Sequence, residues 1–417
     1  MQPLAPIATQ AGHQRVTVAA LFAAYFAGFG VFLPFFPVWL DWLGLSAGWI
    51  AVLVAVPLIV RVLTISAVTD RAERFDDPRK PLLGLSIAAM LVFAILPLAT
   101  LFPTLSGLFS TPWVILAVIA LMAIGWNALL PLSDALGIQL SRQSGVDYGR
   151  VRVWGSIAFV VASFAAGAII ERYGNGTIPW MVLATFAAIV LVCASLPRSF
   201  VQPKIERIDI KGAAKTPKLR SGWVFFLRRK GAMSVFIGAG LMQASHALLY
   251  GFGSLSWASQ GFSETAIGLL WAFSVLCEIV LFAVSAPIIA KLGARGLLIL
   301  GGVGATLRWV IFAFSPDLAF TAALQILHGF SFGMTHLALI SYVQKRARPR
   351  ELRAAQGVYG VVSGGVMAVA TLSAGPLYEA FGAMAYLAMA AMTALGVVII
   401  FINRWRIPGG FVPQPKC

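Results

Sequence analysis

The sequence predicts an all-α integral membrane protein, with twelve transmembrane helices arranged as two pseudo-symmetric six-helix bundles. Hydrophobic residues make up 59% of the 417-residue chain and charged residues only 11%, against roughly 25% charged residues in ordinary soluble domains. The mean hydropathy is +0.88, and long apolar runs recur along the whole chain. So few charges cannot cover a surface that faces water, so most of the chain must face lipid.

The apolar runs are each about twenty residues long, which is the length that a helix needs to cross a bilayer. A helix satisfies its own backbone hydrogen bonds where no water is available, so helices are the expected form of these runs. We expect them near residues 16–39, 47–69, 81–100, 112–136, 151–170, 178–197, 232–257, 265–289, 296–314, 318–343, 355–378 and 383–403.

The basic residues between these runs predict the topology. If the N-terminus is cytoplasmic, 28 of the 31 Lys and Arg residues fall in cytoplasmic segments, as the positive-inside rule requires. We therefore expect a multi-pass protein of a bacterial-type inner (plasma) membrane with both termini in the cytoplasm. The net charge of +16 then reports topology and indicates no nucleic-acid partner. The first run is long enough to span and lacks a cleavage site after it, so we expect no cleavable signal.

The longest hydrophilic stretch divides the chain into an N-terminal bundle (1–197), a basic cytoplasmic linker (198–231) and a C-terminal bundle with a short tail (232–417). TDRAERFDDPRK after the second predicted helix has a weak counterpart, AKLGARG, after the eighth. This weak internal repeat indicates that the two halves arose by duplication. Its charges are expected to cap helix ends and to join neighbouring helices at a cytoplasmic gate, with ordinary anchoring at the membrane surface as the alternative. These gate residues are Asp70, Arg71, Lys291 and Arg295.

Polar groups inside the apolar runs mark the candidate site, because an ionisable side chain at bilayer depth is costly unless it faces a partner or a wet cavity. No Ser-His-Asp or HExxH pattern and no glycine-rich phosphate loop occurs, and the three cysteines are too scattered for a metal site. We therefore expect no enzyme, no ATP-driven pump, no metal and no cofactor. The polar groups are Arg61, Asn127, Asp134, Gln243, His246, Glu278, Arg308, Gln325, His328 and His336.

The second half offers a proton site. Helix depth allows Glu278, Arg308 and His328 to cluster, and His336 shares a polar face with Gln325 and His328. Burial disfavours the charged form of a carboxyl and a nearby arginine favours it. Glu278 can therefore take up and release a proton as Arg308 approaches and withdraws. The alternatives are a static Glu278–Arg308 ion pair and histidines that only hold helices together.

The first half offers a substrate site. Asn127 and Asp134 lie on one face of their predicted helix, and Asp134 is within reach of Arg150 or Arg152. Arg61 has no other acidic partner in this half. An excess of positive charge on a cavity wall favours an anionic substrate, although a wet cavity also solvates an arginine.

Several spaced motifs resemble a known family: LPFFPVWL, LPLSDALGIQLSRQSGVDYGRVRVWG, LRWV, QILHGFSFG and AGPLYEAFG. They are similar to the lactose permease branch of the major facilitator superfamily. MQASHALLYGFGSLSWASQGFSETAIGLLWAFSVLCEI is closer still to the phenylpropionate permeases of that group. The resemblance implies a fold of two bundles that alternate access to a central site, in a protein that works as a monomer.

The resemblance also implies roles for the site residues. Asp134 and Arg152 match a sugar-binding Glu and Arg, whereas Glu278, Arg308 and His328 match the groups that couple substrate to protons. Ser331 stands where lactose permease has its proton-carrying glutamate, so we expect Glu278 or His336 to take over that role. The expected substrate-binding residues are Arg61, Asp134, Arg152, Asn127, Gln243, His246, Tyr25 and Gln325.

The function predicted is proton-coupled import of an aromatic or other carboxylate such as 3-phenylpropionate. The aromatic residues near Trp154 and Phe159 differ in arrangement from those on which the sugar stacks in lactose permease, which counts against a sugar and favours the carboxylate. A symporter for a sugar or a nucleoside-like neutral solute is the open alternative. A proton-antiporting exporter of the same fold is another. VRVWGSIAFVVASFAAG has the glycines of an exporter's efflux signature and lacks its proline, which counts against export.

Overall fold

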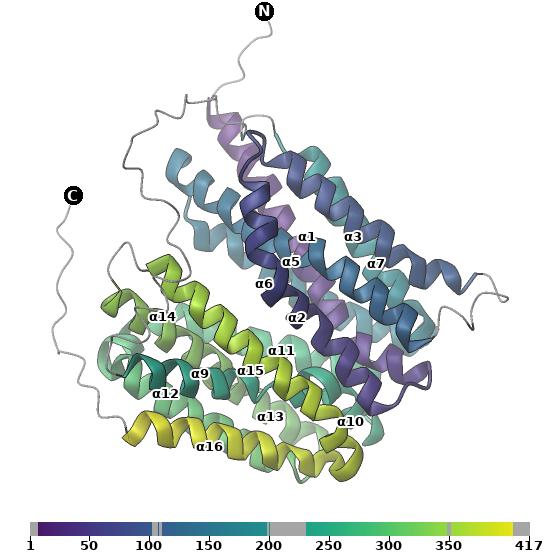
Figure 1. The fold of residues 1–417 in the computed structure, drawn as a ribbon, viewed down its shortest axis with the longest axis vertical. Helices are drawn as coiled ribbons and strands as arrows, with labels where there is room; N and C mark the ends of the chain where they lie inside the picture. The colour runs from purple at the N-terminus through teal and green to yellow at the C-terminus, as the bar shows by residue number, and fades with distance from the viewer. Residues whose placement is uncertain are drawn as a thin grey trace, which may run out of the picture.

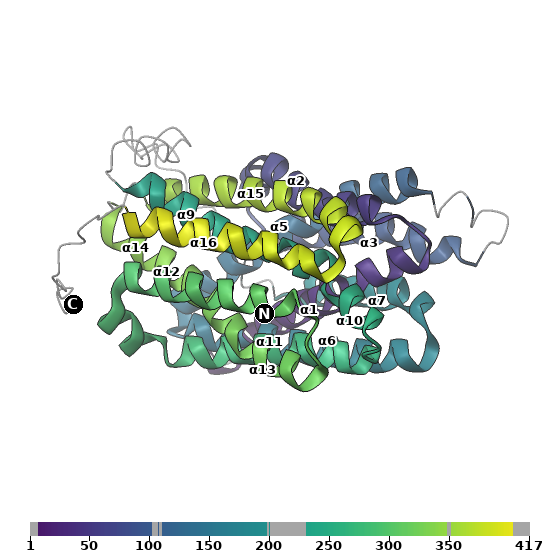
Figure 2. The same ribbon diagram turned by 90° about the horizontal axis from the view of Figure 1, so that it is seen from below.

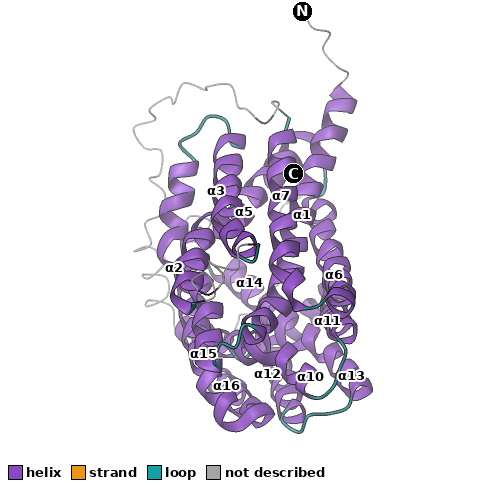
Figure 3. Ribbon diagram, turned by 90° about the vertical axis from the view of Figure 1, so that its right-hand side faces the viewer, coloured by secondary structure: helices purple, strands orange, loops and turns teal. Residues whose placement is uncertain are grey.

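The computed structural model describes residues 7–101, 107, 111–197, 200, 231–347 and 352–402, and every regular element in these ranges is helical (Figure 3). Eleven of its segments are long and apolar enough to cross a membrane. The last, Gly357–Ile402, contains most of α15 and the whole of α16, separated by a short 3-10 turn. The prediction of an all-α, multi-pass membrane protein is confirmed for these residues.

In the described part of the first half, six long helices contact one another. In it, α1 packs against α6 and α7, while α5 packs against α2 and α3. Local signals fix several ends: the Ser46 side chain accepts from the Trp49 N–H, and Gly145 ends α5 with φ 67°. The helices are α1 (Ile7–Trp42), α2 (Ala47–Ala72), α3 (Arg79–Ala99), α5 (Pro112–Ser144), α6 (Tyr148–Tyr173) and α7 (Ile178–Ser195).

In the second half, α16 packs against both α9 and α12, and α9 also packs against α15 (Figure 2). Two helical segments here contain π-helical turns, η3 and η4. The elements are α9 (Ala232–Ala244), η3 (Leu249–Gly253), α10 (Ser254–Ser259), α11 (Glu264–Ala283), α12 (Ser285–Phe312), α13 (Leu318–His328), η4 (Gly329–Met334), α14 (Thr335–Arg346), α15 (Leu352–Phe381), η5 (Gly382–Ala385) and α16 (Tyr386–Ile402).

The structure corrects the regular helices predicted near 232–257, 265–289, 296–314 and 318–343. The first and last of these contain η3 and η4, and π-turns occur frequently at functional sites. Between the other two, α12 begins at Ser285 and passes through Gly293, whose φ of 64° is outside the helical range. Only glycine adopts that conformation at little cost.

The two halves meet at the ends of their helices that lie away from the chain termini, and they diverge towards the termini (Figure 1). At the closed end, a side chain on Gly167 would meet the Glu264 carbonyl, and one on Gly268 would meet the Ser163 carbonyl. A Cβ at Gly375 of α15 would lie 2.6 Å from the Ala47 oxygen of α2. Glycine is therefore required where α6 approaches α11 and where α2 approaches α15.

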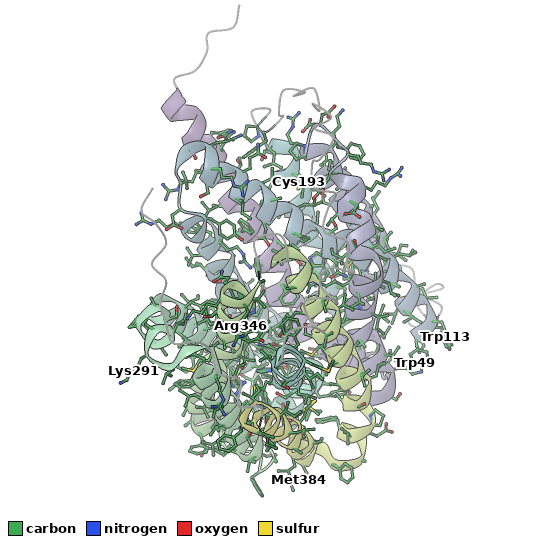
Figure 4. The ribbon with its side chains drawn as sticks, turned by 60° about the vertical axis from the view of Figure 1, so that its left-hand side comes forward. Trp49, Trp113, Cys193, Lys291, Arg346 and Met384 are labelled. Atoms are coloured by element: carbon green, nitrogen blue, oxygen red, sulfur yellow. The ribbon has the colours of Figure 1, made fainter. Side chains whose placement is uncertain are left out.

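Two tryptophans mark this closed end. The rings of Trp49 and Trp113, near the start of α2 and α5, lie 4.7 Å apart and are labelled together in Figure 4. The same figure shows Lys291 at a different edge of the molecule, away from these two tryptophans.

The predicted linker, 198–231, lies outside the described residues except for Phe200 and Gly231, so the predicted domain boundaries stay a prediction.

Candidate functional site

Arg308 of α12 is the centre of a buried polar cluster in the second half, and its side chain is 0% exposed. Its Nη1 donates to His328 Nδ1 at 3.1 Å and its Nη2 donates to Gln325 Oε1 at 2.7 Å. A longer bond of 3.4 Å runs from Nη1 to Ser331 Oγ. The guanidinium also lies over the Trp309 ring, 4.7 Å from its centroid. All these partners are neutral when His328 is, so they leave the arginine charge uncompensated.

Glu278 lies next to this cluster on α11, with its Oε2 4.0 Å from His328 Nε2. Its side chain is 17% exposed, whereas that of His328 is 6% exposed. Close packing explains the approach, because a Cβ at Gly329 would lie only 3.2 Å from the Cys277 carbonyl of α11. The predicted cluster therefore forms, but His328 stands between Glu278 and Arg308, and no direct ion pair of those two is found among the described residues.

His246, in the turn that follows α9, joins the same cluster. Its Nδ1 lies 3.1 Å from the Gln243 carbonyl and its Nε2 lies 3.1 Å from Ser331 Oγ. The Gln243 side chain donates to the Phe332 carbonyl at 3.2 Å, which ties α9 to η4. The π-turn thus carries both Ser331 and the acceptor for Gln243.

His336 does not join this hydrogen-bonded network. Its ring stacks at 6.1 Å on Phe332, whose other stacking partner, at 5.7 Å, is His328. The side chain is exposed. Its predicted part in proton coupling stays a prediction, now without a hydrogen bond to support it.

A second polar site lies in the first half, where α5 meets α6. Asp134 Oδ1 accepts from the Tyr148 hydroxyl at 2.7 Å and lies 3.7 Å from Arg152 Nε. The Arg152 guanidinium covers the Phe26 ring at 4.1 Å. The side chains of Arg152 and Asp134 are 30% and 35% exposed. The expected pairing is present with Arg152, in a site that a solute can reach.

The glycine contacts between α6 and α11 place the two sites at one level. Gly167 lies against Glu264 and Gly268 lies against Ser163. The two pairs belong to one antiparallel register, because a step of four residues back along α6 matches a step of four residues forward along α11. Continuing that register along both helices brings Arg152 level with Glu278. The charge of Arg152 accordingly acts on Glu278. The sequence gives no sign of this pairing, because the two residues belong to different halves.

The remaining predicted substrate residues surround the first-half site. Tyr25 is 7% exposed and lies within electrostatic range of both Arg61 and Arg152. Arg61 is exposed on α2, and Asn127 is half-buried, where its Nδ2 donates to the Pro57 carbonyl at 2.9 Å. Asn127 therefore joins α5 to α2 and has part of its hydrogen-bonding capacity committed there.

The predicted gate residues differ in what they contact. Arg295 joins α12 to α16 by donating to the Phe401 carbonyl at 2.9 Å. In the described ranges, Asp70, Arg71 and Lys291 are exposed and have no hydrogen bond through their side chains. The gate role of these three residues stays a prediction, with surface anchoring as its alternative.

The sequence analysis missed an ion pair near this gate. Asp77 receives a bidentate pair from Arg79 at 2.8 and 2.6 Å, and Arg79 also donates to the Leu196 carbonyl at the end of α7 at 3.4 Å. The hydrogen bonds from Arg79 hold the pKa of Asp77 below its usual value.

Two residues of the candidate site were also missed. Tyr148 lies in the YGRVRVWG motif, but its bond to Asp134 crosses a loop that no periodicity describes. Ser331 was noted only as a replacement for an acid, whereas it bonds to His246 and Arg308. A polar residue between two glycines and two phenylalanines in an apolar run is the signal that could have identified it.

Comparison with known proteins agrees with this architecture. The sequence matches the family described as "MFS_1 like family" over residues 16–389. The chain belongs to this family. The "Probable 3-phenylpropionic acid transporter" of Escherichia coli (strain K12) is 31% identical over 376 residues, which are 88% of this chain and 93% of the relative. The "Maltose permease" of Geobacillus stearothermophilus is 27% identical over 94% of this chain and 95% of its own length.

A solved structure supports the same fold. The crystal structure of the nucleoside transporter NupG aligns with a TM-score of 0.79 at 15% identity and covers 94% of this chain and 100% of that one. The relatives and the structural neighbour are transporters. This member of the major facilitator superfamily is therefore a multi-pass membrane transporter of a small-molecule substrate and is not an enzyme.

Proposed function

We propose that the protein is a proton-coupled symporter that imports a small aromatic or other carboxylate, such as 3-phenylpropionate, by alternating access. Twelve membrane helices form two six-helix bundles that rock about a central site. Both termini lie in the cytoplasm of a bacterial-type inner membrane. The protein works as a monomer, driven by the proton gradient without a cofactor.

The observation that carries the proposal is the charge of the groups at the two sites. Three arginines stand against two carboxylates, and the buried one, Arg308, bonds only to neutral acceptors in the described structure. A buried charge without a counter-ion is costly. A substrate carboxylate supplies the missing negative charge, and the 3-phenylpropionic acid transporter is the relative whose name fits it. The groups are Arg61, Arg152, Arg308, Asp134 and Glu278.

The position of Glu278 supports coupling to protons. Its carboxyl is partly exposed, adjoins His328 and lies level with Arg152 across the α6–α11 contact. When Glu278 is protonated, Arg152 loses a competing carboxylate and can bind that of the substrate. Proton and anion then favour each other's binding, which is the condition for symport.

The test uses proteoliposomes of the purified protein that enclose a pH-sensitive dye. External 3-phenylpropionate or benzoate should acidify the interior, and Glu278→Gln should abolish the signal while retaining exchange of labelled substrate. Empty liposomes measure passive entry of the neutral acid. Glu379→Gln, an exposed carboxyl of α15, is the matched control. Acidification that persists unchanged in Glu278→Gln would contradict the role of Glu278.

A neutral sugar is the second candidate, and one observation favours it. Asp134 and Arg152 form a half-exposed pair with Tyr148, which offers donors and acceptors to hydroxyl groups, and one relative is a maltose permease. The same liposomes are therefore given maltose, lactose and uridine. Acidification with one of these neutral solutes and with neither acid would replace the carboxylate proposal.

A further inference from the structure

Hydrogen-bond partners fix which ring nitrogen carries the proton in both buried histidines. A guanidinium can only donate, so His328 Nδ1, which faces Arg308 Nη1 at 3.1 Å, must accept. A carbonyl can only accept, so His246 Nδ1, which faces the Gln243 carbonyl at 3.1 Å, must donate. Neutral His328 therefore carries its proton on Nε2 and neutral His246 carries its proton on Nδ1. The two histidines are opposite tautomers.

Ser331 can satisfy His246 in two states. Its Oγ lies 3.1 Å from His246 Nε2 and 3.3 Å from the His328 carbonyl, and it accepts from Arg308 Nη1 at 3.4 Å. While His246 is neutral, the Ser331 hydroxyl donates to Nε2. If the hydroxyl rotates to the His328 carbonyl, Oγ can accept from a protonated Nε2. Both ring nitrogens of a charged His246 then have acceptors.

His328 lacks this freedom. A proton on its Nδ1 would place two donors face to face, because Arg308 Nη1 cannot accept and lies 3.1 Å away. His328 can become charged only if Arg308 moves. Of the two buried histidines, His246 alone can gain a proton without a rearrangement of heavy atoms.

We propose that His246 is a second proton-binding site of the transport cycle, with the Ser331 hydroxyl as its rotating hydrogen-bond partner. This inference rests on the function proposed above and adds a site where Ser331 replaces the expected acid. The proton enters from water on one side of the membrane, resides on Nε2 and leaves to water on the other side. No heavy-atom bond forms or breaks.

The charges around His246 link this proton to an anion. Arg308 of α12 and His328 of α13 face it, the Tyr250 ring lies 5.8 Å from it at a tilt, and Glu278 of α11 lies beyond His328. From α15 and α16, the residues packed against the neighbouring Ala244 and Ala247 are apolar, such as Ala370, Met367 and Met392. Because Arg308 opposes a second positive charge, His246 gains its proton when a carboxylate is bound nearby.

The first test is spectroscopic and uses the small number of histidines, four in the chain. Nitrogen-15 NMR of histidine-labelled protein should show His246 protonated on Nδ1 and His328 on Nε2, assigned with His246→Gln and His328→Gln. Lowering the pH without substrate should charge His246 before His328. The same tautomer for both residues, or the reverse order of charging, would overturn the proposal.

The second test adds 3-phenylpropionate to wild-type protein, Ser331→Ala, Ser331→Thr and the surface control His13→Gln. We expect substrate to convert His246 to the imidazolium in wild type and Ser331→Thr. In Ser331→Ala the change should require a pH about one unit lower, since the charged ring loses an acceptor. An unchanged midpoint in Ser331→Ala would overturn the role of the hydroxyl.

Transport separates this inference from the proposed function. If wild type shows acid-driven proton uptake and His246→Gln takes up as many protons per substrate, His246 is not a proton site. If wild type moves none of the acids, the proposed substrate is wrong, and the titration without substrate still decides whether His246 or His328 is charged first. Fewer protons taken up per substrate in His246→Gln than in wild type, with substrate exchange retained, supports both the second proton site and the proposed symport.

Discussion

The polar sites of the two halves differ in how the charge of their arginine is compensated. In the first half, Arg152 lies 3.7 Å from Asp134 and both are about one-third exposed. In the second half, Arg308 is fully buried and bonds to a histidine, a glutamine and a serine. The first site is compensated and accessible, whereas the second is uncompensated and enclosed.

This difference in compensation and exposure suggests different roles for the two polar sites. An accessible ion pair can exchange one of its partners for a solute, because water and substrate compete for the same groups. A buried cation bonded to titratable and rotatable neighbours responds mainly to changes in the charge around it. Under the proposed function, the first site would bind the substrate and the second would couple its transport to protons.

The strongest test of this difference removes the buried arginine. Arg308→Leu leaves Gln325 and His328 without their donor, and we expect uptake of 3-phenylpropionate to fall at least about 100-fold. Arg308→Lys keeps the charge but lacks the fork of donors, so a loss of about tenfold is expected. Arg172→Lys, at an exposed position of α6, is the control. Uptake above half the wild-type rate in Arg308→Leu would refute an essential buried cation.

The next test concerns the close contact between α6 and α11, whose register places Arg152 and Glu278 at the same height. Gly268→Val would push α11 away from the Ser163 carbonyl of α6 and should widen the closed end of the molecule. Pulsed EPR between labels at Tyr173 and Ala258, in protein without its native cysteines, should show a new longer distance in most molecules. Gly365→Val is the control, because a Cβ there meets nothing within 4 Å. An unchanged distance would mean that α11 absorbs the valine elsewhere.

A smaller effect distinguishes an anion site from a sugar site. Asp134→Asn removes the carboxylate that competes for Arg152, so we expect the Kd for 3-phenylpropionate to fall about two- to fivefold, the value of a partly exposed ion pair. Calorimetry on purified protein measures this Kd. Asp147 is not used as a control position, because its side chain caps α6. Glu379→Gln is again the control. A weaker affinity for the acid would indicate that Asp134 itself contacts the solute.

The smallest expected effect lies outside both sites, at the ion pair of Asp77 and Arg79. The pKa of Asp77 is lowered by its hydrogen bonds to Arg79, so the pair stabilises the fold at neutral pH. This stability is present above the unfolded pKa of about 4 and disappears as the pH falls through the lower folded value. Asp77→Asn should cost about 1 kcal/mol or less at pH 7.

The pH dependence provides the check on that pair. Thermal unfolding in detergent at pH 7 should show a lower Tm for Asp77→Asn than for wild type, and the difference should shrink below about pH 4. Asp76→Asn changes an exposed neighbour and should leave Tm unchanged. A difference that grows at acidic pH would mean that Asp77 is not the carboxylate form in the folded protein.

Much of the site could be predicted from residue type alone. Glu278, Arg308 and His328 stand out because ionisable groups are rare in apolar helices, and helix spacing was enough to predict that they cluster. Spacing could not predict that His328 would lie between the other two, because this depends on how η4 packs against α11 at Gly329. Nor could it predict the exposed position of His336.

Hydropathy and segment length along the chain were enough to predict the membrane environment and the approximate positions of the helices. Which polar groups meet depends on how the helices pack in the folded protein. The α6–α11 register, the π-turn that carries Ser331 and the orientation of each imidazole all depend on contacts between segments far apart in the sequence. Such contacts leave no periodic signal, because hydrogen bonds between helices are set by packing and not by spacing along one of them.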